Sequence, residues 1–156
     1  MKPDEKFERP QTDPWQDLAN ACAPRHRIDR LHARGVLLAI GNRVLEEDLA
    51  GAAELVARAR KLSAKREPDL HAAVRDEILM AATEHVRSVD PRFLSRPDYD
   101  LHYTVEARAE LEARLRAAEL LGIEIDPGLL ERVAAADRLL EPRLGSGLDQ
   151  GGPGRA

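Results

Sequence analysis

Apolar residues of this chain recur at steps of three and four positions, and this spacing constrains the fold more than any other feature. Between about 45 and 65 the residues that follow it are Leu45, Leu49, Ala52, Val56 and Ala59. This spacing forms a stripe along one face of an α-helix, and the stripe must be buried against other helices. No window of useful length shows the two-residue alternation of a β-strand. The pattern predicts an all-α fold.

Helix caps and breakers divide the chain into about six helices. The expected helices begin at Asp13-Pro14, with Gln16 as capping-box partner, at about 25, at about 45, at Pro68, before Leu111 and at Asp126-Pro127. Their expected ends are Pro24, Gly41-Asn42, about 65, Asp90-Pro91, Gly122 and Arg143. Short connections favour a single-domain bundle of mostly antiparallel helices, with stacked helix hairpins as the alternative.

Two further features concern packing within this bundle. Gly51, followed by Ala52 and Ala53, would let a neighbouring helix approach closely. In the last helix Leu129, Leu130, Val133 and Leu140 are expected to face inward. Both expectations follow from small or apolar residues at helical spacing.

The two ends of the chain differ in composition from the part between them. Residues 1–11 carry charges of both signs and no apolar run, which predicts a flexible segment that is not a secretory signal. After Arg143 the sequence LGSGLDQGGPGRA holds five glycines and a proline, which predicts a disordered tail over 144–156. One helical domain is expected over 12–143.

The composition indicates which cellular compartment and which class of partner fit this chain. The formal net charge of -4 argues against general binding of polyanions, although an acidic total can hide a local basic face. The single cysteine, Cys22, excludes an internal disulfide and a cysteine-based zinc site, and it fits a reducing compartment. The longest apolar stretch, GVLLAIG, is too short to span a bilayer. We expect a cytoplasmic protein that does not enter a membrane.

The segment DLHAAVRDEILMAATEHV, residues 69–86, combines two histidines with several carboxylates, as metal-binding helices do. On a helix, His71 and His85 lie about 21 Å apart at 1.5 Å per residue, which is too far for a shared metal ion. His85 falls on the apolar stripe that includes Val74 and Ile78. We expect a buried packing residue, with a proton-transfer or ligand role as the alternative.

A basic segment coincides with the second expected helix. Positions 25 to 43 hold five arginines and one aspartate, and Arg27, Arg30 and Arg34 share one face of that helix. Clustered arginines are typical of surfaces that contact phosphates or an acidic partner. The alternative is a solvated face paired with acidic neighbours.

The short motif DYDLH contains Asp98, Asp100 and His102 at alternate positions. In an extended segment these side chains would point the same way, and their ligand atoms suit a divalent metal. A calcium EF-hand is excluded, because Tyr103 and Ala109 stand where that loop needs glycine and glutamate. The acidic residues fit helix capping equally well, so a metal site is left open.

The long connection from Asp90 to Tyr103 concentrates residues of the types found at protein interfaces. It holds three of the five aromatic residues together with two arginines, the set being Arg92, Phe93, Arg96, Tyr99 and Tyr103. Aromatic residues and arginine are enriched at the energetic centres of interfaces. The alternative is that the aromatic rings fold back and seal one end of the bundle.

The chain lacks the nucleotide-binding, nucleophile-elbow and zinc motifs that would indicate an enzyme. No catalytic residue, metal ligand or cofactor is therefore assigned. The sequence favours a non-enzymatic protein that binds another protein, as an accessory subunit, adaptor or regulator, with a homo-oligomer left open. The alternatives are a nucleic-acid-binding protein that uses the arginine face and a metal-dependent helical enzyme.

Overall fold

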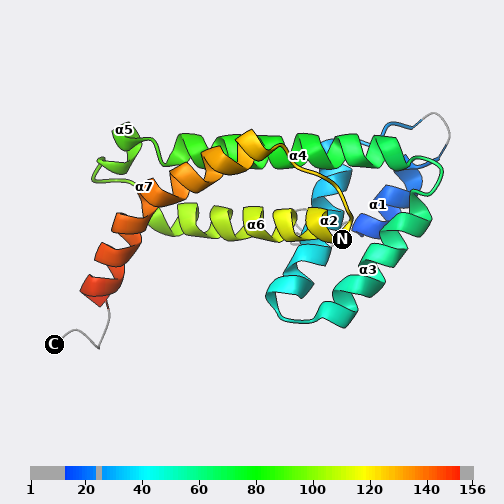
Figure 1. The fold of residues 1–156 in the computed structure, drawn as a ribbon, viewed down its shortest axis with the longest axis horizontal. Coiled ribbons are helices and arrows are strands. Elements are labelled where there is room, and N and C mark those ends of the chain that lie inside the picture. The colour runs from blue at the N-terminus through cyan, green and yellow to red at the C-terminus, as the bar shows by residue number, and fades with distance from the viewer. Residues whose placement is uncertain (1–12, 24–25, 152–156) are drawn as a thin grey trace, which may run out of the picture.

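The computed structural model describes residues 13–23 and 26–151, with side chains described as far as Leu144, and every regular element in these residues is a helix (Figure 1). The elements are α1 (Pro14–Ala21), α2 (Arg30–Leu45), α3 (Leu49–Leu62), α4 (Glu67–Ser88), α5 (Pro91–Leu94), α6 (Leu101–Leu120) and α7 (Pro127–Gly151). The predicted all-α fold is confirmed. None of the described helices is both long and apolar enough to cross a membrane.

Helix α2 is the centre of the fold, because it packs against α1, α3, α4 and α6. The long helices α4 and α6 run antiparallel beside each other, and α2 crosses them instead of lying along them (Figure 1). Helix α7 packs against α4. The main core lies where α2 meets its neighbours, and its fully buried side chains include Leu18, Leu37, Ile40, Val74, Ile78 and Leu111.

Gly41 was expected to end the second helix, but α2 continues through it to Leu45. Gly41 is the point where α2 touches α6, and a Cβ atom there would overlap the backbone carbonyl of Ala113. Only glycine lets the two backbones approach this closely. Gly51, which was expected to allow such an approach, instead lies beside the N-cap of its own helix, Asp48.

The start of α2 also differs from the sequence expectation. Asp29 caps this helix by accepting the backbone N–H groups of Leu31 and His32, while the Asp29 N–H donates to the His32 ring at 3.0 Å. The helix therefore begins at Arg30 and not near residue 25. Asp13 caps α1 as predicted, but Gln16 bonds to Asn20 and forms no capping box with it.

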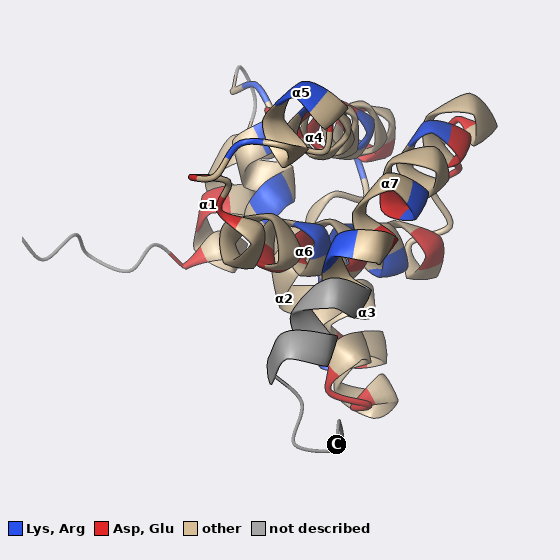
Figure 2. Ribbon diagram, turned by 90° about the vertical axis from the view of Figure 1, so that its left-hand side faces the viewer, with Lys and Arg blue, Asp and Glu red and all other residues tan. Residues whose placement is uncertain are grey.

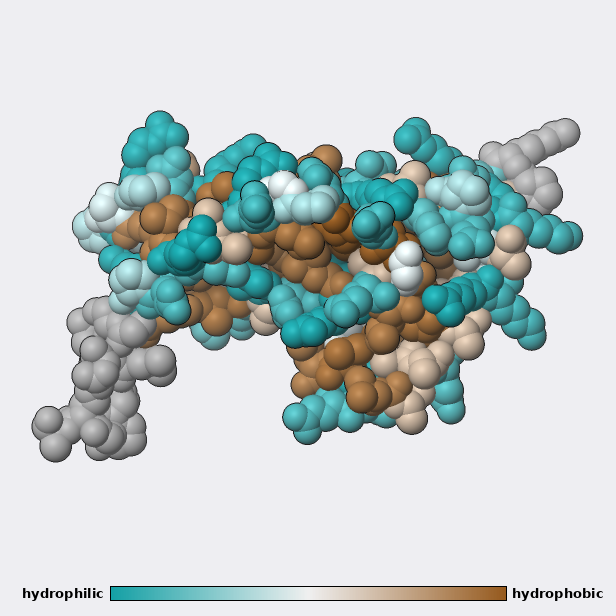
Figure 3. All heavy atoms as spheres, in the orientation of Figure 1, coloured by the Kyte–Doolittle hydropathy of each residue, from teal (hydrophilic) through white to brown (hydrophobic). Residues whose placement is uncertain are grey.

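Three leucines predicted to face inward lie on the surface instead. Leu45 ends α2 and Leu49 begins α3, so the turn between these helices splits the expected stripe and leaves both side chains exposed. Figure 3 shows hydrophobic residues at this α2–α3 corner. Leu130 is also exposed, whereas its neighbours Leu129 and Val133 are buried as predicted.

The last helix extends beyond Arg143, where the sequence placed the start of the tail. The backbone of α7 is helical to Gly151. Glycine lowers helix stability by about 1 kcal/mol but does not forbid the helical conformation. The rest of the predicted tail, residues 152–156, and the predicted flexible segment, residues 1–11, lie outside the described residues.

Candidate functional site

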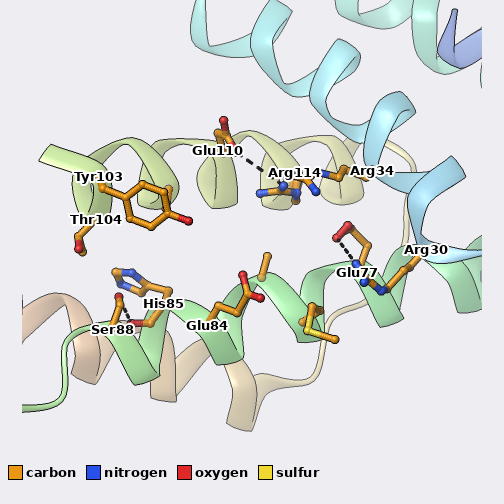
Figure 4. Close-up of a pocket in the computed structure, with 13 residues that line it drawn as sticks. Arg30, Arg34, Glu77, Glu84, His85, Ser88, Tyr103, Thr104, Glu110 and Arg114 are labelled. Carbon is orange, nitrogen blue, oxygen red and sulfur yellow. Dashed lines mark hydrogen bonds and ion pairs between the residues drawn. The ribbon is translucent and has the colours of Figure 1, made fainter. Parts of the chain in front are cut away.

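A groove of about 220 Å³ opens between α4 and α6, close to the beginning of α2 (Figure 4). We call it the charged groove. Its charged and hydroxyl-bearing lining includes Arg30, Arg34, Glu77, Glu84, His85, Ser88, Tyr103, Thr104, Glu110 and Arg114. Three arginines and three glutamates thus share one groove, so its formal charge is balanced but unevenly paired.

The ion pairs of the charged groove leave some of its charges unmatched. Arg30 lies 3.5 Å from the Glu77 carboxylate, and Arg114 lies 3.8 Å from that of Glu110. Within the part of the chain that the structure describes, Arg34 and Glu84 form no ion pair below 4.0 Å. Each of these two exposed residues can therefore pair with a ligand of opposite charge.

The floor of the groove contains polar atoms that are buried but have no hydrogen-bond partner among the described residues. They are Glu77 Oε2, Arg114 Nε and His85 Nδ1. The Glu77 and Arg114 residues are only 2% and 4% exposed, so bulk water does not solvate them fully. An unsatisfied buried polar group costs about 1–3 kcal/mol. A group that supplies the missing partner would recover this energy on binding.

Burial governs the protonation of the two buried charges. It raises the pKa of the Glu77 carboxyl, although Arg114, Arg34 and Arg30 oppose this shift. Burial also lowers the pKa of the Arg114 guanidinium, with Glu77 acting in the opposite direction. In both residues the loss of hydration outweighs the attraction of the neighbouring charge. The two charges are therefore incompletely compensated by each other.

His85 is buried, as its position on the apolar stripe predicted. Its Nε2 donates to Asp137 on α7 at 2.8 Å, and Asp137 also accepts from Nε and Nη2 of Arg108 at 2.9 and 3.0 Å. This cluster of His85, Asp137 and Arg108 joins α4, α7 and α6. The packing role predicted for His85 therefore includes a specific hydrogen bond that fixes its ring.

A second hollow of about 310 Å³ adjoins the charged groove, and the two share Glu84, Ser88, Tyr103 and Thr104. We call it the aromatic hollow, because its lining includes Phe93, Tyr99 and Tyr103. Tyr99 is partly buried and its hydroxyl lies 2.8 Å from Thr104 Oγ1, whereas Tyr103 is 65% exposed. The Tyr99 side chain is thus held in place by a hydrogen bond, whereas most of the Tyr103 side chain is exposed to solvent.

The structure separates the two arginines predicted beside these aromatic rings. The Arg96 guanidinium stacks over the Phe93 ring at 4.9 Å, next to the aromatic hollow. Arg92 points into solvent and pairs with Asp90 at 3.1 Å, so it does not line the hollow. The connection is also not an open loop, because α5 occupies its first half.

The arginine face is only partly assembled as the sequence predicted. Arg30 and Arg34 lie on α2 and line the charged groove, but Arg27 precedes the helix and does not share their face. The reason is the Asp29 cap, which sets the start of α2 at Arg30. Figure 2 shows basic and acidic residues together on α4, α6 and α7.

The possible metal ligands of the DYDLH motif do not converge. Asp100 caps α6 by accepting the Tyr103 N–H at 2.9 Å, and His102 pairs with Glu106 at 3.0 Å. Asp98 is exposed. Across residues 13–23 and 26–144 there is no group of three or more histidine, cysteine and acidic side chains placed to hold a metal ion. Capping is the role that the structure gives to Asp100.

The sequence indicated an ion pair between Glu110 and Arg114, which the structure has at 3.8 Å, but no functional role for Arg114, Asp137 or Arg108. One signal was present, because Arg114 interrupts the apolar stripe formed by Leu111 and Ala118 on α6. A charged residue at such a position needs a partner or a function. For Asp137 and Arg108 the sequence offers no comparable signal, since their contacts join different helices.

Comparison with known proteins gives no family assignment for this chain. No protein-family model, no curated protein and no solved structure matches it. The charged groove and the aromatic hollow are therefore the features of this chain that bear on its function.

Proposed function

We propose that this protein binds another protein, as an accessory subunit, adaptor or regulator, by taking up an apolar side chain of the partner in the aromatic hollow. The observation that carries this proposal is the gathering of Phe93, Tyr99 and Tyr103 around one surface hollow. Aromatic side chains provide a large contact area and dominate the binding energy of many interfaces.

The aromatic hollow is largely preformed. Tyr99 is held by its hydrogen bond to Thr104 and by the Arg143 guanidinium, which lies 5.9 Å from its ring centre. Phe93 is covered on one side by Arg96. Binding to a rigid site loses less conformational entropy than binding to a mobile one. Tyr103 is mainly exposed and can adjust when a partner side chain enters.

Charged residues of both signs, Glu84, Arg87 and Asp100, line the hollow, and Arg87 is the one that a partner carboxylate could pair with. Arg87 is exposed and forms no ion pair below 4.0 Å with the described residues. Arg96 stands beside the hollow through its contact with Phe93. A carboxylate near these two guanidinium groups would add electrostatic complementarity, which mainly improves specificity and the rate of association.

The alternative of nucleic-acid binding receives less support. Glu77, Glu84 and Glu110 line the same groove as Arg30 and Arg34, so a phosphate backbone seated there would meet three carboxylates. Like charges brought together in this way oppose binding. We place the proposed role in the cytoplasm, in keeping with the single cysteine of the sequence.

Replacing Tyr103 by alanine is expected to weaken partner binding without loss of stability. Truncating an aromatic residue at the centre of an interface costs about 1–4 kcal/mol, or roughly fivefold to several hundredfold in affinity. Tyr103 is mainly exposed, so its removal leaves the core intact. A partner that copurifies from the host would be identified by mass spectrometry, produced separately and titrated against both proteins by calorimetry.

Leu139→Ala is the matched control, because Leu139 is 48% exposed but lies outside the aromatic hollow. It should bind the partner like the wild type. Equal affinities of the wild type and Tyr103→Ala would refute the proposed site. If the partner is a second copy of this chain, the native mass should rise with concentration in the wild type and less so in Tyr103→Ala.

A further inference from the structure

We propose that the charged groove is a binding site for a small zwitterion, namely a free α-amino acid. The groove adjoins the aromatic hollow and shares Glu84, Ser88, Tyr103 and Thr104 with it, but this ligand goes beyond the protein-binding role. This ligand is favoured by two unpaired charges of opposite sign, by buried polar atoms without partners and by the size of the groove.

Glu77 and Glu110 lie beside the arginines of the groove, whereas Glu84 lies away from them (Figure 4). Figure 4 shows Arg34 and Arg114 together at the end near α2, while Glu84 extends from α4 into the space between α4 and α6. A ligand carboxylate would bind beside the two arginines. Its ammonium group would then lie toward α4, from which both Glu77 and Glu84 line the groove.

The buried atoms provide the directional contacts that charge alone does not. Arg114 Nε is a hydrogen-bond donor without an acceptor, and Glu77 Oε2 is an acceptor without a donor. Both belong to side chains that are more than nine-tenths buried and line the groove. A carboxylate accepts from the first and an ammonium group donates to the second. One zwitterion therefore satisfies both atoms.

The same arrangement disfavours ligands of a single charge. An anion without an ammonium group would leave Glu77 Oε2 unpaired and would be repelled by Glu84. A cation without a carboxylate would be repelled by Arg34 and Arg114 and could not accept their hydrogen bonds. Discrimination of this kind follows from leaving buried polar groups unpaired when the wrong ligand binds.

The size and the apolar part of the lining suit a ligand of this class. The groove measures about 220 Å³, which is below the range of about 300–1,000 Å³ typical of sites for drug-sized molecules. Met80, Ala81 and Ala107 line it between the charged residues. They provide a surface for a modest apolar side chain.

The test uses the purified full chain and each standard amino acid at millimolar concentration. At least one amino acid should raise the melting temperature and give a saturable heat in calorimetry. Its N-acetyl derivative lacks the ammonium group and its amide lacks the carboxylate, so each should bind about tenfold more weakly or worse. No binding by any amino acid, or equal binding by the N-acetyl derivative, overturns the assignment.

Two variants place the ligand within the groove. Arg34→Gln and Glu84→Gln should each lower the affinity for that amino acid about tenfold, because each removes one of the unpaired charges. Both residues are exposed, so both variants should fold. Arg132→Gln, which removes an exposed arginine of α7 outside the groove, is the control and should bind normally. Unchanged affinity in Arg34→Gln and Glu84→Gln would contradict the proposed site. Because no partner protein is present, this result is independent of the test with Tyr103→Ala.

Discussion

The Gly41→Ala variant is expected to lose about 3 kcal/mol of unfolding free energy, since overpacking a close contact typically costs 1–3 kcal/mol and occasionally more. The added methyl group would overlap the backbone carbonyl of Ala113, which cannot rotate away as a flexible side chain would. Helices α2 and α6 must therefore separate. The higher helix propensity of alanine offsets at most about 1 kcal/mol of this loss. Urea denaturation followed by circular dichroism measures the difference.

Gly128→Ala is the control for this substitution. Gly128 lies in the first turn of α7, and the nearest atoms to a Cβ built there are 3.6 Å away. Its stability should stay within about 0.5 kcal/mol of the wild type. A Gly41→Ala protein as stable as Gly128→Ala would mean that α2 and α6 do not meet backbone to backbone.

The Asp137→Asn variant is expected to lose about 2–3 kcal/mol, because hydrogen bonds to charged groups contribute about 1.5–3 kcal/mol and a stranded partner adds a penalty. Asparagine keeps the size of the side chain but loses its charge and one acceptor oxygen. The buried His85 ring and the Arg108 guanidinium then compete for the remaining oxygen. Because the Asp137 side chain is 35% exposed, the loss should stay below that of a fully buried ion pair.

Thermal unfolding measures this loss, and Asp76→Asn is its control. Asp76 is an exposed carboxylate of α4 without an ion pair below 4.0 Å among the described residues. Its replacement should change the unfolding free energy by less than about 0.5 kcal/mol. Equal stability of Asp137→Asn and Asp76→Asn would show that the cluster with His85 and Arg108 does not stabilise the fold.

The contribution of Asp137 should depend on pH. Burial alone would raise the pKa of its carboxyl, but hydrogen bonds from Arg108 and His85 outweigh burial and hold that pKa below its usual value. A depressed carboxyl pKa stabilises the folded state fully above the unfolded pKa of about 3.9. The stabilisation is lost as the pH falls through the folded pKa. The stability difference between wild type and Asp137→Asn should therefore be constant near neutrality and shrink below about pH 4.

Local signals predicted much of the fold. Asp13 caps α1, Pro68 lies in the first turn of α4, and Gly122, with φ of 72°, follows the end of α6 as expected. These features depend on residues within one helical turn, so a sequence displays them directly. Gly41 was misjudged for the opposite reason, because its role depends on Ala113 in a distant part of the chain.

The residues of the candidate site were likewise predictable only where they are close to one another in the sequence. Phe93, Tyr99 and Tyr103 are close in sequence, and the structure brings all three to the aromatic hollow. The charged groove was not predicted, because its key residues come from three helices. Arg34 comes from α2, Glu84 from α4 and Arg114 from α6. Periodicity indicates which face of a helix is buried, but it does not indicate which residue of another helix lies opposite.

Chemical-shift mapping with the purified partner is the most direct test of the aromatic hollow as the binding surface. The proposed site predicts that the largest amide shifts fall within residues 88–104, around Phe93, Tyr99 and Tyr103. The α2–α3 corner, where Leu45 and Leu49 are exposed, is the competing hydrophobic surface and should change little. Large shifts at that corner, with residues 88–104 unchanged, would contradict the proposed site.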